Sequence, residues 1–198
     1  MLDEKRLERQ LSFLVEIDKM KTVLRRNLIA DGSRRENDAE HSWHMAVMAL
    51  VLYEYAYSPE VDLCRALNMT LLHDLVEVYA GDTFCYDEAG KVDKAERERR
   101  AADKLFALPP EEQGSEYRAL WEEFDAMQTP DSIYAAAIDR MQPLLLNYLT
   151  KGHTWHQANI GSDKVYERMD MIKKGMPKLW PVVEYIVNDS IEKGFLKE

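Results

Sequence analysis

The sequence predicts an all-α fold in a single domain, and three observations lead to this prediction. Apolar residues recur at helical spacing along most of the chain, with charged residues between them. Proline and glycine divide these segments where helices end. No segment has the alternating pattern that is typical of a strand. We therefore expect one helical bundle over residues 1–198, with no internal repeat and no linker.

The composition limits the classes of partner. Hydrophobic residues make up 46% and charged residues 31%, and 36 acidic against 26 basic residues give a net charge of −10. Nucleic-acid polymers and anionic membranes select large basic surfaces, so neither is expected as the main partner. A small anion in a local pocket stays compatible with this charge. Cys64 and Cys85 have neither metal spacing nor a disulfide framework, and no signal-like or membrane-spanning run occurs, which favours the cytoplasm.

The first elements follow from periodicity and capping signals. Residues 3–27 have the apolar spacing of an amphipathic helix, and a loop is expected at residues 30–33. Asn37 and Glu40 have the spacing of a capping box, which places His41 in the first turn of the next helix. That helix is apolar nearly all round through Leu52, so we expect it to lie centrally in the fold.

The later elements are separated by proline and glycine. Ser58 and Pro59 are expected to start a helix that runs to Gly81. The segments beyond it are a loop over 82–91, a solvated helix over 92–107, a helix from Pro110 to about Met127, a helix opened by Thr129-Pro130-Asp131, a loop over 152–161, and two last helices, the second beginning near Pro177.

The candidate site centres on the stretch from Leu71 to Asp82. His73 and Asp74 stand together in an apolar run, Glu77 follows on the same helical face, and Asp82 comes after a glycine. Burying this many ionisable groups is costly unless a ligand orders them, and a divalent cation suits both imidazole and carboxylate. The alternative is a satisfied core histidine beside an ordinary polar neighbour.

Two residues outside this stretch could complete a metal site. Asp139 interrupts an apolar helix that is expected to be buried, and a buried carboxylate is rarely left unpaired. Its neighbour Arg140 could be a simple salt-bridge partner instead. His41, taken alone, could be a histidine without function at a helix N-terminus.

The ordered set His41, His73-Asp74 and Asp139 resembles the HD superfamily of metal-dependent phosphohydrolases. Further matches resemble its 5′-deoxynucleotidase branch, which dephosphorylates deoxyribonucleoside 5′-monophosphates. These matches are Arg35-Glu36-Asn37, Glu40-His41-Ser42, His73-Asp74-x-x-Glu77 and Gly81-Asp82. The resemblance covers about residues 7–150 and implies an HD-type bundle with its metal-binding core there, followed by C-terminal helices over 151–198.

The resemblance also implies roles for individual residues. His41, His73, Asp74 and Asp139 would hold one divalent cation (Mn, Co, Zn, Fe, Ni or Mg), with a metal-bound water attacking the 5′-phosphate. Glu77 would orient or deprotonate that water, and Asp82 would protonate the leaving 5′-oxygen. Arg26 would hold the substrate, although it could equally be a surface charge that closes the first helix. Family members are homodimers, so a homodimer is expected.

His44, His153 and His156 could be mistaken for a second metal site. The resemblance implies one cation, because two-metal members of the superfamily carry further histidines between the His-Asp pair and the last aspartate, and residues 75–138 contain none. His153 and His156 come after Asp139 and are assigned to packing or surface. Three alternatives to the 5′-deoxynucleotidase stay open. The chain could be another single-metal HD phosphohydrolase, acting on a nucleoside triphosphate, a guanosine polyphosphate or another phosphomonoester. It could be a non-catalytic module that binds metal or nucleotide to regulate a partner. It could also be a helical scaffold whose histidines are core residues.

Overall fold

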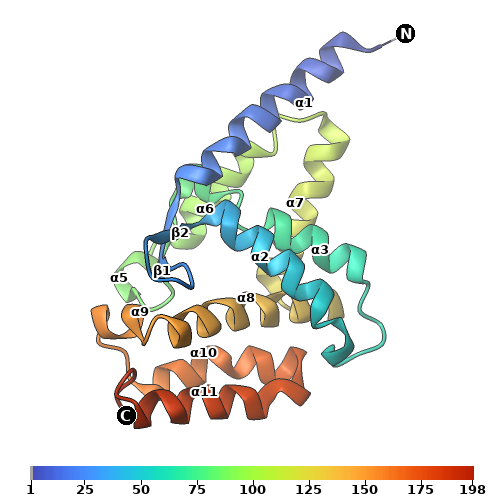
Figure 1. Cartoon of the computed structure of the whole chain (residues 1–198). Helices are drawn as coiled ribbons and strands as arrows, with labels where there is room; N and C mark the ends of the chain where they lie inside the picture. Colours follow the sequence, from blue (N-terminus) through green and yellow to red (C-terminus); the bar gives the residue numbers. More distant parts are fainter. Residues whose placement is uncertain (1) are drawn as a thin grey trace.

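A computed structural model describes residues 2–198, and the long helix α8 (Pro130–Leu149) lies at its centre (Figure 1). Helices α2 and α3 pack against one side of α8, and α10 packs against the other side with α11 outside it. The main hydrophobic core surrounds α8, and a smaller one lies near α6. The all-α prediction is confirmed, and the strands are limited to one short hairpin.

The N-terminal segment differs from the single helix expected over residues 3–27. Helix α1 (Glu4–Ile17) ends ten residues earlier than expected, a 3₁₀ turn η1 (Asp18–Thr22) follows, and the chain then forms β1 (Leu24–Leu28). Strand β1 pairs antiparallel with β2 (Arg35–Asn37). The expectation of no strands was therefore wrong here. Strand β1 escapes a pattern search because it is mostly polar and its partner has only three residues.

Helix α2 (Asp38–Val51) begins as predicted, and a second difference concerns its surroundings. The capping box of Asn37 and Glu40 is present, followed after the helix by the 3₁₀ turn η2 (Tyr53–Tyr55). However, the helix is not buried all round. Four large apolar side chains of α2 are exposed to solvent, namely Trp43, Val47, Leu50 and Val51.

The helix expected from Ser58 to Gly81 is two helices. Asp62 caps the backbone N–H groups of Cys64 and Arg65, so α3 (Leu63–Leu72) begins later than Pro59 predicts. A tightened stretch over residues 73–76, with i→i+3 backbone hydrogen bonds, separates α3 from α4 (Glu77–Ala80). Gly81 ends α4 with φ 76°, a backbone conformation that glycine adopts readily.

The remaining helices follow the predicted order with small differences. Thr129 and Ser132 form a capping box at the start of α8, as the Thr-Pro-Asp signal suggested. The loops expected over 82–91 and 152–161 contain the short helices α5 and α9, respectively. The other elements are α5 (Glu88–Lys91), α6 (Lys94–Leu105), α7 (Glu111–Ala126), α9 (His153–Gln157), α10 (Ser162–Gly175), the 3₁₀ turn η3 (Pro177–Leu179) and α11 (Trp180–Glu192).

Two further expectations can be compared with the described residues. None of their helices combines the length and the apolar character that a membrane span needs. Both cysteines are free, as their spacing predicted.

Helix α10 approaches α8 closely at Gly175. A Cβ atom added there would lie 2.7 Å from the Cβ of Ala137 and 2.7 Å from the backbone oxygen of Ile133. We expect Gly175→Ala to lower the free energy of unfolding by about 1–3 kcal/mol, because a backbone oxygen cannot move aside as a side chain can. Chemical denaturation measures this loss. Lys173→Ala, on the exposed surface of the same helix, should stay within about 0.5 kcal/mol of the wild type, and an equal loss in both variants would contradict the argument.

Candidate metal centre

Four side chains from three separate parts of the chain meet at the middle of α8. Nε2 of His41 lies 3.1 Å from Oδ1 of Asp139 and 3.8 Å from Oδ2 of Asp74. Nε2 of His73 lies 3.0 Å from Oδ2 of Asp74 and 3.8 Å from Oδ1 of Asp139. His41, His73 and Asp139 each offer a ligand atom within 4.8 Å of the others, and all three are buried. The convergence expected for these four side chains is therefore present.

The backbone around His73 helps two adjacent residues to reach one point. Side chains of neighbouring residues on a regular α-helix diverge by about 100°. Here α3 ends at Leu72, and His73 and Asp74 begin the tightened stretch between α3 and α4. Both side chains lie against the same group of atoms, with Nε2 of His73 and Oδ2 of Asp74 3.0 Å apart.

Each imidazole is oriented by a hydrogen bond at its other nitrogen. Nδ1–H of His73 donates to the backbone oxygen of Thr70 (3.0 Å), and Nδ1–H of His41 donates to Oε1 of Gln142 (3.0 Å). Gln142 is held in that orientation because its Nε2 donates to Oε1 of Glu36 (2.6 Å). Both histidines therefore present the lone pair of Nε2 to the cluster, which is the arrangement that a metal ligand requires.

The protonation states and an unpaired atom also fit a cation. Burial lowers the pKa of His41 to about 4, so its imidazole is neutral near pH 7. Burial acts to raise the pKa of Asp139, but the charge of Arg140 and the contacts with His41 and His73 together outweigh it and hold the pKa well below its usual range. Nε2 of His73 is buried and has no hydrogen-bond partner among residues 2–198. Burial acts to lower the pKa of His73, but its contacts with Asp74 and the charge of Asp139 together raise it, so the two carboxylates favour a positive charge at this point. Two imidazoles and two carboxylates make a donor set that suits Mn, Fe, Co, Ni or Zn.

A group of acidic side chains lies on one side of this cluster. Carboxylate oxygens of Asp38, Asp74 and Glu77 come within 4.8 Å of one another. Arg25 of β1 reaches into the group, and its Nη1 lies 2.7 Å from Oδ2 of Asp74 and 3.2 Å from Oδ1 of Asp38. Burial, together with the charges of Asp74 and Asp38, raises the pKa of Glu77 well above its usual value. Oε2 of Glu77 has no partner among the described residues.

Two guanidinium groups lie on the other side, against the second oxygen of Asp139. Nη1 of Arg140 is 2.6 Å from Oδ2 of Asp139, and Nη2 of Arg168 from α10 is 3.5 Å from the same atom. The salt bridge weighed as an alternative for Asp139 thus exists together with the histidine contacts. One oxygen faces the imidazoles and the other faces the guanidinium groups.

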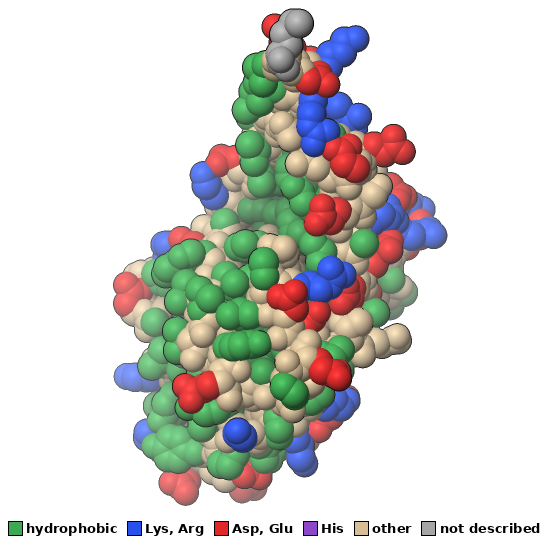
Figure 2. Space-filling model, turned by 90° about the vertical axis from the view of Figure 1, so that its right-hand side faces the viewer, with side chains coloured by type: hydrophobic (Ala, Val, Ile, Leu, Met, Phe, Trp, Pro, Cys, Tyr) green, Lys and Arg blue, Asp and Glu red, His purple; other side chains and the backbone are tan. Residues whose placement is uncertain are grey.

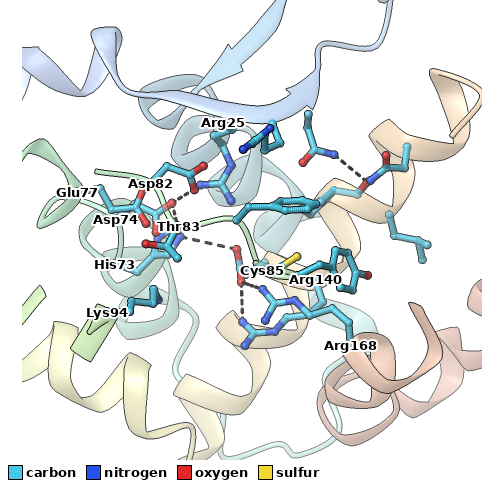
Figure 3. A pocket seen from close by; sticks show the side chains of 18 of the residues that line it. Arg25, His73, Asp74, Glu77, Asp82, Thr83, Cys85, Lys94, Arg140 and Arg168 are labelled. Atoms are coloured by element: carbon cyan, nitrogen blue, oxygen red, sulfur yellow. Dashed lines mark hydrogen bonds and ion pairs between the residues drawn. The ribbon is translucent and has the colours of Figure 1, made fainter. Parts of the chain in front are cut away.

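The cluster opens into a cavity of about 260 Å³. Figure 3 shows Glu77, Asp74 and Asp82 on one side of this cavity and Arg140 and Arg168 on the other. The rest of the cavity wall combines polar side chains, such as those of Asn27, Lys94 and Asn147, with aromatic and apolar ones. The aromatic and apolar part is formed by Phe84, Tyr86, Phe124, Met127, Pro143, Leu144, Trp155 and Met169.

The two remaining predicted site residues also line this cavity. Asp82 is half-buried, and burial raises the pKa of its carboxyl group. Arg26 is exposed, and its guanidinium carbon lies 5.7 Å from the ring centre of Phe84. Arg26 does not close a helix, as one alternative supposed, because it lies in β1.

Histidines outside the cluster occupy the places that the sequence suggested. His156 is exposed, and His153 is partly buried in α9. His44 is partly buried, and its Nδ1 lies 3.2 Å from Nε2 of Gln142. None of these three belongs to a group of possible metal ligands among the described residues.

Several residues around the cluster were not identified from the sequence as parts of a site. Arg25 was overlooked because its segment was interpreted as a helix, whereas a strand brings it to Asp74. Asp38 is buried beside Glu77, and a charged residue at the start of a helix is too common to suggest this. Arg168 lies beyond the range of the motifs. Gln142, three residues after Asp139, was detectable as a further polar residue in a buried helix.

Comparisons with solved structures agree with this architecture. A crystal structure from Magnetospirillum magnetotacticum MS-1, described as a predicted metal-dependent phosphohydrolase, is 47% identical in sequence with a TM-score of 0.95. The match covers 100% of this chain and 99% of that one. A conserved hypothetical protein from Pyrococcus furiosus is 20% identical with a TM-score of 0.61. This match covers 92% of this chain and 99% of the Pyrococcus chain. This second likeness shows a shared fold alone.

Comparisons with curated proteins point the same way. Human 5′-deoxynucleotidase HDDC2 is 28% identical over 136 residues, which are 68% of this chain and 65% of the human protein. HDDC2 from Dictyostelium discoideum is 27% identical over 143 residues, which are 70% of this chain and 75% of that protein. The matched part thus spans just under two thirds of the human relative. The family model of the HD domain matches residues 17–180, most of the sequence, and the chain therefore belongs to the HD domain family.

Proposed function

We propose that this chain is a metal-dependent phosphohydrolase that removes the 5′-phosphate from deoxyribonucleoside 5′-monophosphates. The observation that carries the proposal is the convergence of two oriented imidazoles and two carboxylates beside a cavity that is partly lined by aromatic side chains. Relatives named 5′-deoxynucleotidases support the choice of substrate. Aromatic and apolar side chains suit a nucleoside, and the guanidinium groups suit its phosphate.

In this proposal His41, His73, Asp74 and Asp139 hold the divalent cation. When bound, such a cation offsets charge on the phosphoryl oxygens and lowers the pKa of a coordinated water. The chain itself orients both imidazoles, through Gln142 for His41 and through the backbone of Thr70 for His73. The ligands are therefore arranged before any cation binds.

Glu77 is proposed to accept the proton of the attacking water. Its buried carboxyl group has a raised pKa, which makes the ionised form a stronger base than a free glutamate. Asp82 lines the same cavity, and its own raised pKa suits a group that donates a proton to the leaving 5′-oxygen. Arg26, at the exposed rim beside Phe84, is proposed to contact the substrate.

The proposal extends to the assembly and its setting. We propose that residues 1–198 act as one domain in a cytoplasmic homodimer. Figure 2 shows a face of the molecule where hydrophobic side chains gather with few charged ones among them. Trp43, Val47 and Leu50 are exposed on one side of α2, as expected of a surface that another protein copy covers.

The substrate assignment is tested by phosphate release from the purified protein with Mn²⁺ or Co²⁺. We expect deoxyribonucleoside 5′-monophosphates to be hydrolysed at least about tenfold more efficiently, in kcat/KM, than nucleoside triphosphates or guanosine polyphosphates. Non-nucleotide phosphomonoesters serve as the comparison within the same reaction class. Activity confined to any of those other substrates would reject the 5′-deoxynucleotidase assignment and keep a different phosphohydrolase of the family.

The metal site is tested by removing and restoring the cation. Chelation should abolish phosphate release, and cation present at 100 times its Kd should add about 2.7 kcal/mol to the free energy of unfolding. His73→Asn should reduce the bound metal well below one ion per chain by elemental analysis. His156→Asn, at an exposed histidine, is the matched control and should retain it. A wild-type protein without a stoichiometric cation would instead favour the helical scaffold.

The role of Glu77 is tested by Glu77→Gln, which removes the base and keeps the shape. We expect kcat to fall by about 10²- to 10⁴-fold while metal content is unchanged. Glu123→Gln is the control, because this partly buried glutamate pairs with Arg65 and lies outside the cavity wall. A parallel loss of metal and turnover in Glu77→Gln would mean that Glu77 has a structural role.

A further inference from the structure

Asp139 faces two guanidinium groups although its charge balances only one. Oδ1 of Asp139 lies toward His41, which leaves Oδ2 for both arginines. Nη1 of Arg140 takes this oxygen at 2.6 Å, a short charge-assisted hydrogen bond. Nη2 of Arg168 remains at 3.5 Å, beyond the usual length of a hydrogen bond. Arg168 therefore lies beside Asp139 without forming a hydrogen bond to it.

No other acidic group compensates for Arg168. Among residues 2–198, Asp139 is the sole carboxylate within 4 Å of its guanidinium group. Arg140 is 8% exposed, so one of the two positive charges is held almost out of water. Two cations thus lie close together at a place where only one anion is provided.

The position of the two arginines is also accessible. Both line the catalytic cavity, and both line a second cavity of about 580 Å³ that lies next to it. Arg140 and Arg168 therefore stand where the two cavities join, across from Glu77 and Asp82 (Figure 3). The side chain of Arg168 is 33% exposed, so it can change rotamer without disturbing the core.

We propose that Arg168, backed by the buried Arg140, forms an anion site that binds the phosphate dianion of the substrate. A phosphate group at the junction supplies the charge that Asp139 lacks and accepts the parallel N–H bonds of a guanidinium fork. Arg168 moves from its loose contact with Asp139 to this phosphate. Arg140 keeps Asp139 paired throughout. The proposal rests on the phosphohydrolase function for the identity of its ligand, and Arg168 lies outside the residues that the family motifs indicate.

The opposed walls give this site a chemical consequence. Glu77 and Asp82 lie on one side of the cavity, and Arg168 holds the phosphate from the other. Carboxylates repel a phosphate dianion, so a phosphate bound at the arginines is kept away from the acidic wall where the water is deprotonated. This separation orients the phosphorus atom between the attacking water and the guanidinium groups.

The test measures binding of inorganic phosphate to the Mn²⁺-loaded protein by calorimetry. Arg168→Gln should weaken phosphate binding by about 10- to 100-fold and raise KM more than it lowers kcat, because it removes a charge-assisted contact. Arg168→Lys keeps the positive charge but lacks the guanidinium fork, so its phosphate affinity should lie between those of the wild type and Arg168→Gln. Lys173→Gln removes a charge from an exposed position on the same helix, outside both cavities, and should match the wild type.

A second measurement separates phosphate binding from a structural role. If Arg168 only positions Asp139, Arg168→Gln will weaken Mn²⁺ binding as much as phosphate binding, and that result overturns the proposal. Unchanged phosphate affinity in Arg168→Gln, or no phosphate binding by the wild type, overturns it too. Different results would reject the anion site and the proposed substrate. Phosphate binding that depends on Arg168, without hydrolysis of nucleoside monophosphates, would keep the anion site and reject the substrate assignment.

Discussion

The site depends on how one buried carboxylate, that of Asp139, is shared. A carboxylate inside a helical core is costly unless both of its oxygens have partners. Here Oδ2 accepts a hydrogen bond from Arg140, whereas Oδ1 faces the lone pair of Nε2 of His41, where a cation between the two atoms would be its partner. Because Asp139 lies in the middle of α8, which packs against α2, α3 and α10, this division also decides where the histidines and the arginines lie relative to the helix.

Acidic and basic side chains lie on opposite sides of the cavity. The acidic side chains at α2 and α4 lie together, and Arg25 offsets the repulsion between them by pairing with Asp38 and Asp74. The arginines of α8 and α10 lie opposite. A phosphohydrolase needs this separation, because a base for water and a binding site for phosphate have opposite charge requirements. Local charge therefore matters more here than the net charge of −10.

The sequence predicted the helices and the four converging residues better than the surroundings of the site. Capping signals at Asn37 and Thr129 are local, and both are present. The positions of His41, His73, Asp74 and Asp139 predict that their side chains converge, because members of the HD family share one fold that brings these positions together. The break between α3 and α4, in contrast, depends on tertiary packing, which propensity does not describe. Arg168 approaches Asp139 from a later helix, and no local pattern records such a contact.

Strand β1, which the sequence did not predict, determines where Arg25 and Arg26 lie relative to the site. Alternate residues of a strand point to opposite sides, so Arg25 and Arg26 serve different places. Arg25 points into the acidic group and is 14% exposed, whereas Arg26 stays exposed at the cavity rim. Asn27 then turns inward and is buried, as the same alternation requires. The strand thus brings Arg25 to the carboxylates and Arg26 to the entrance of the cavity.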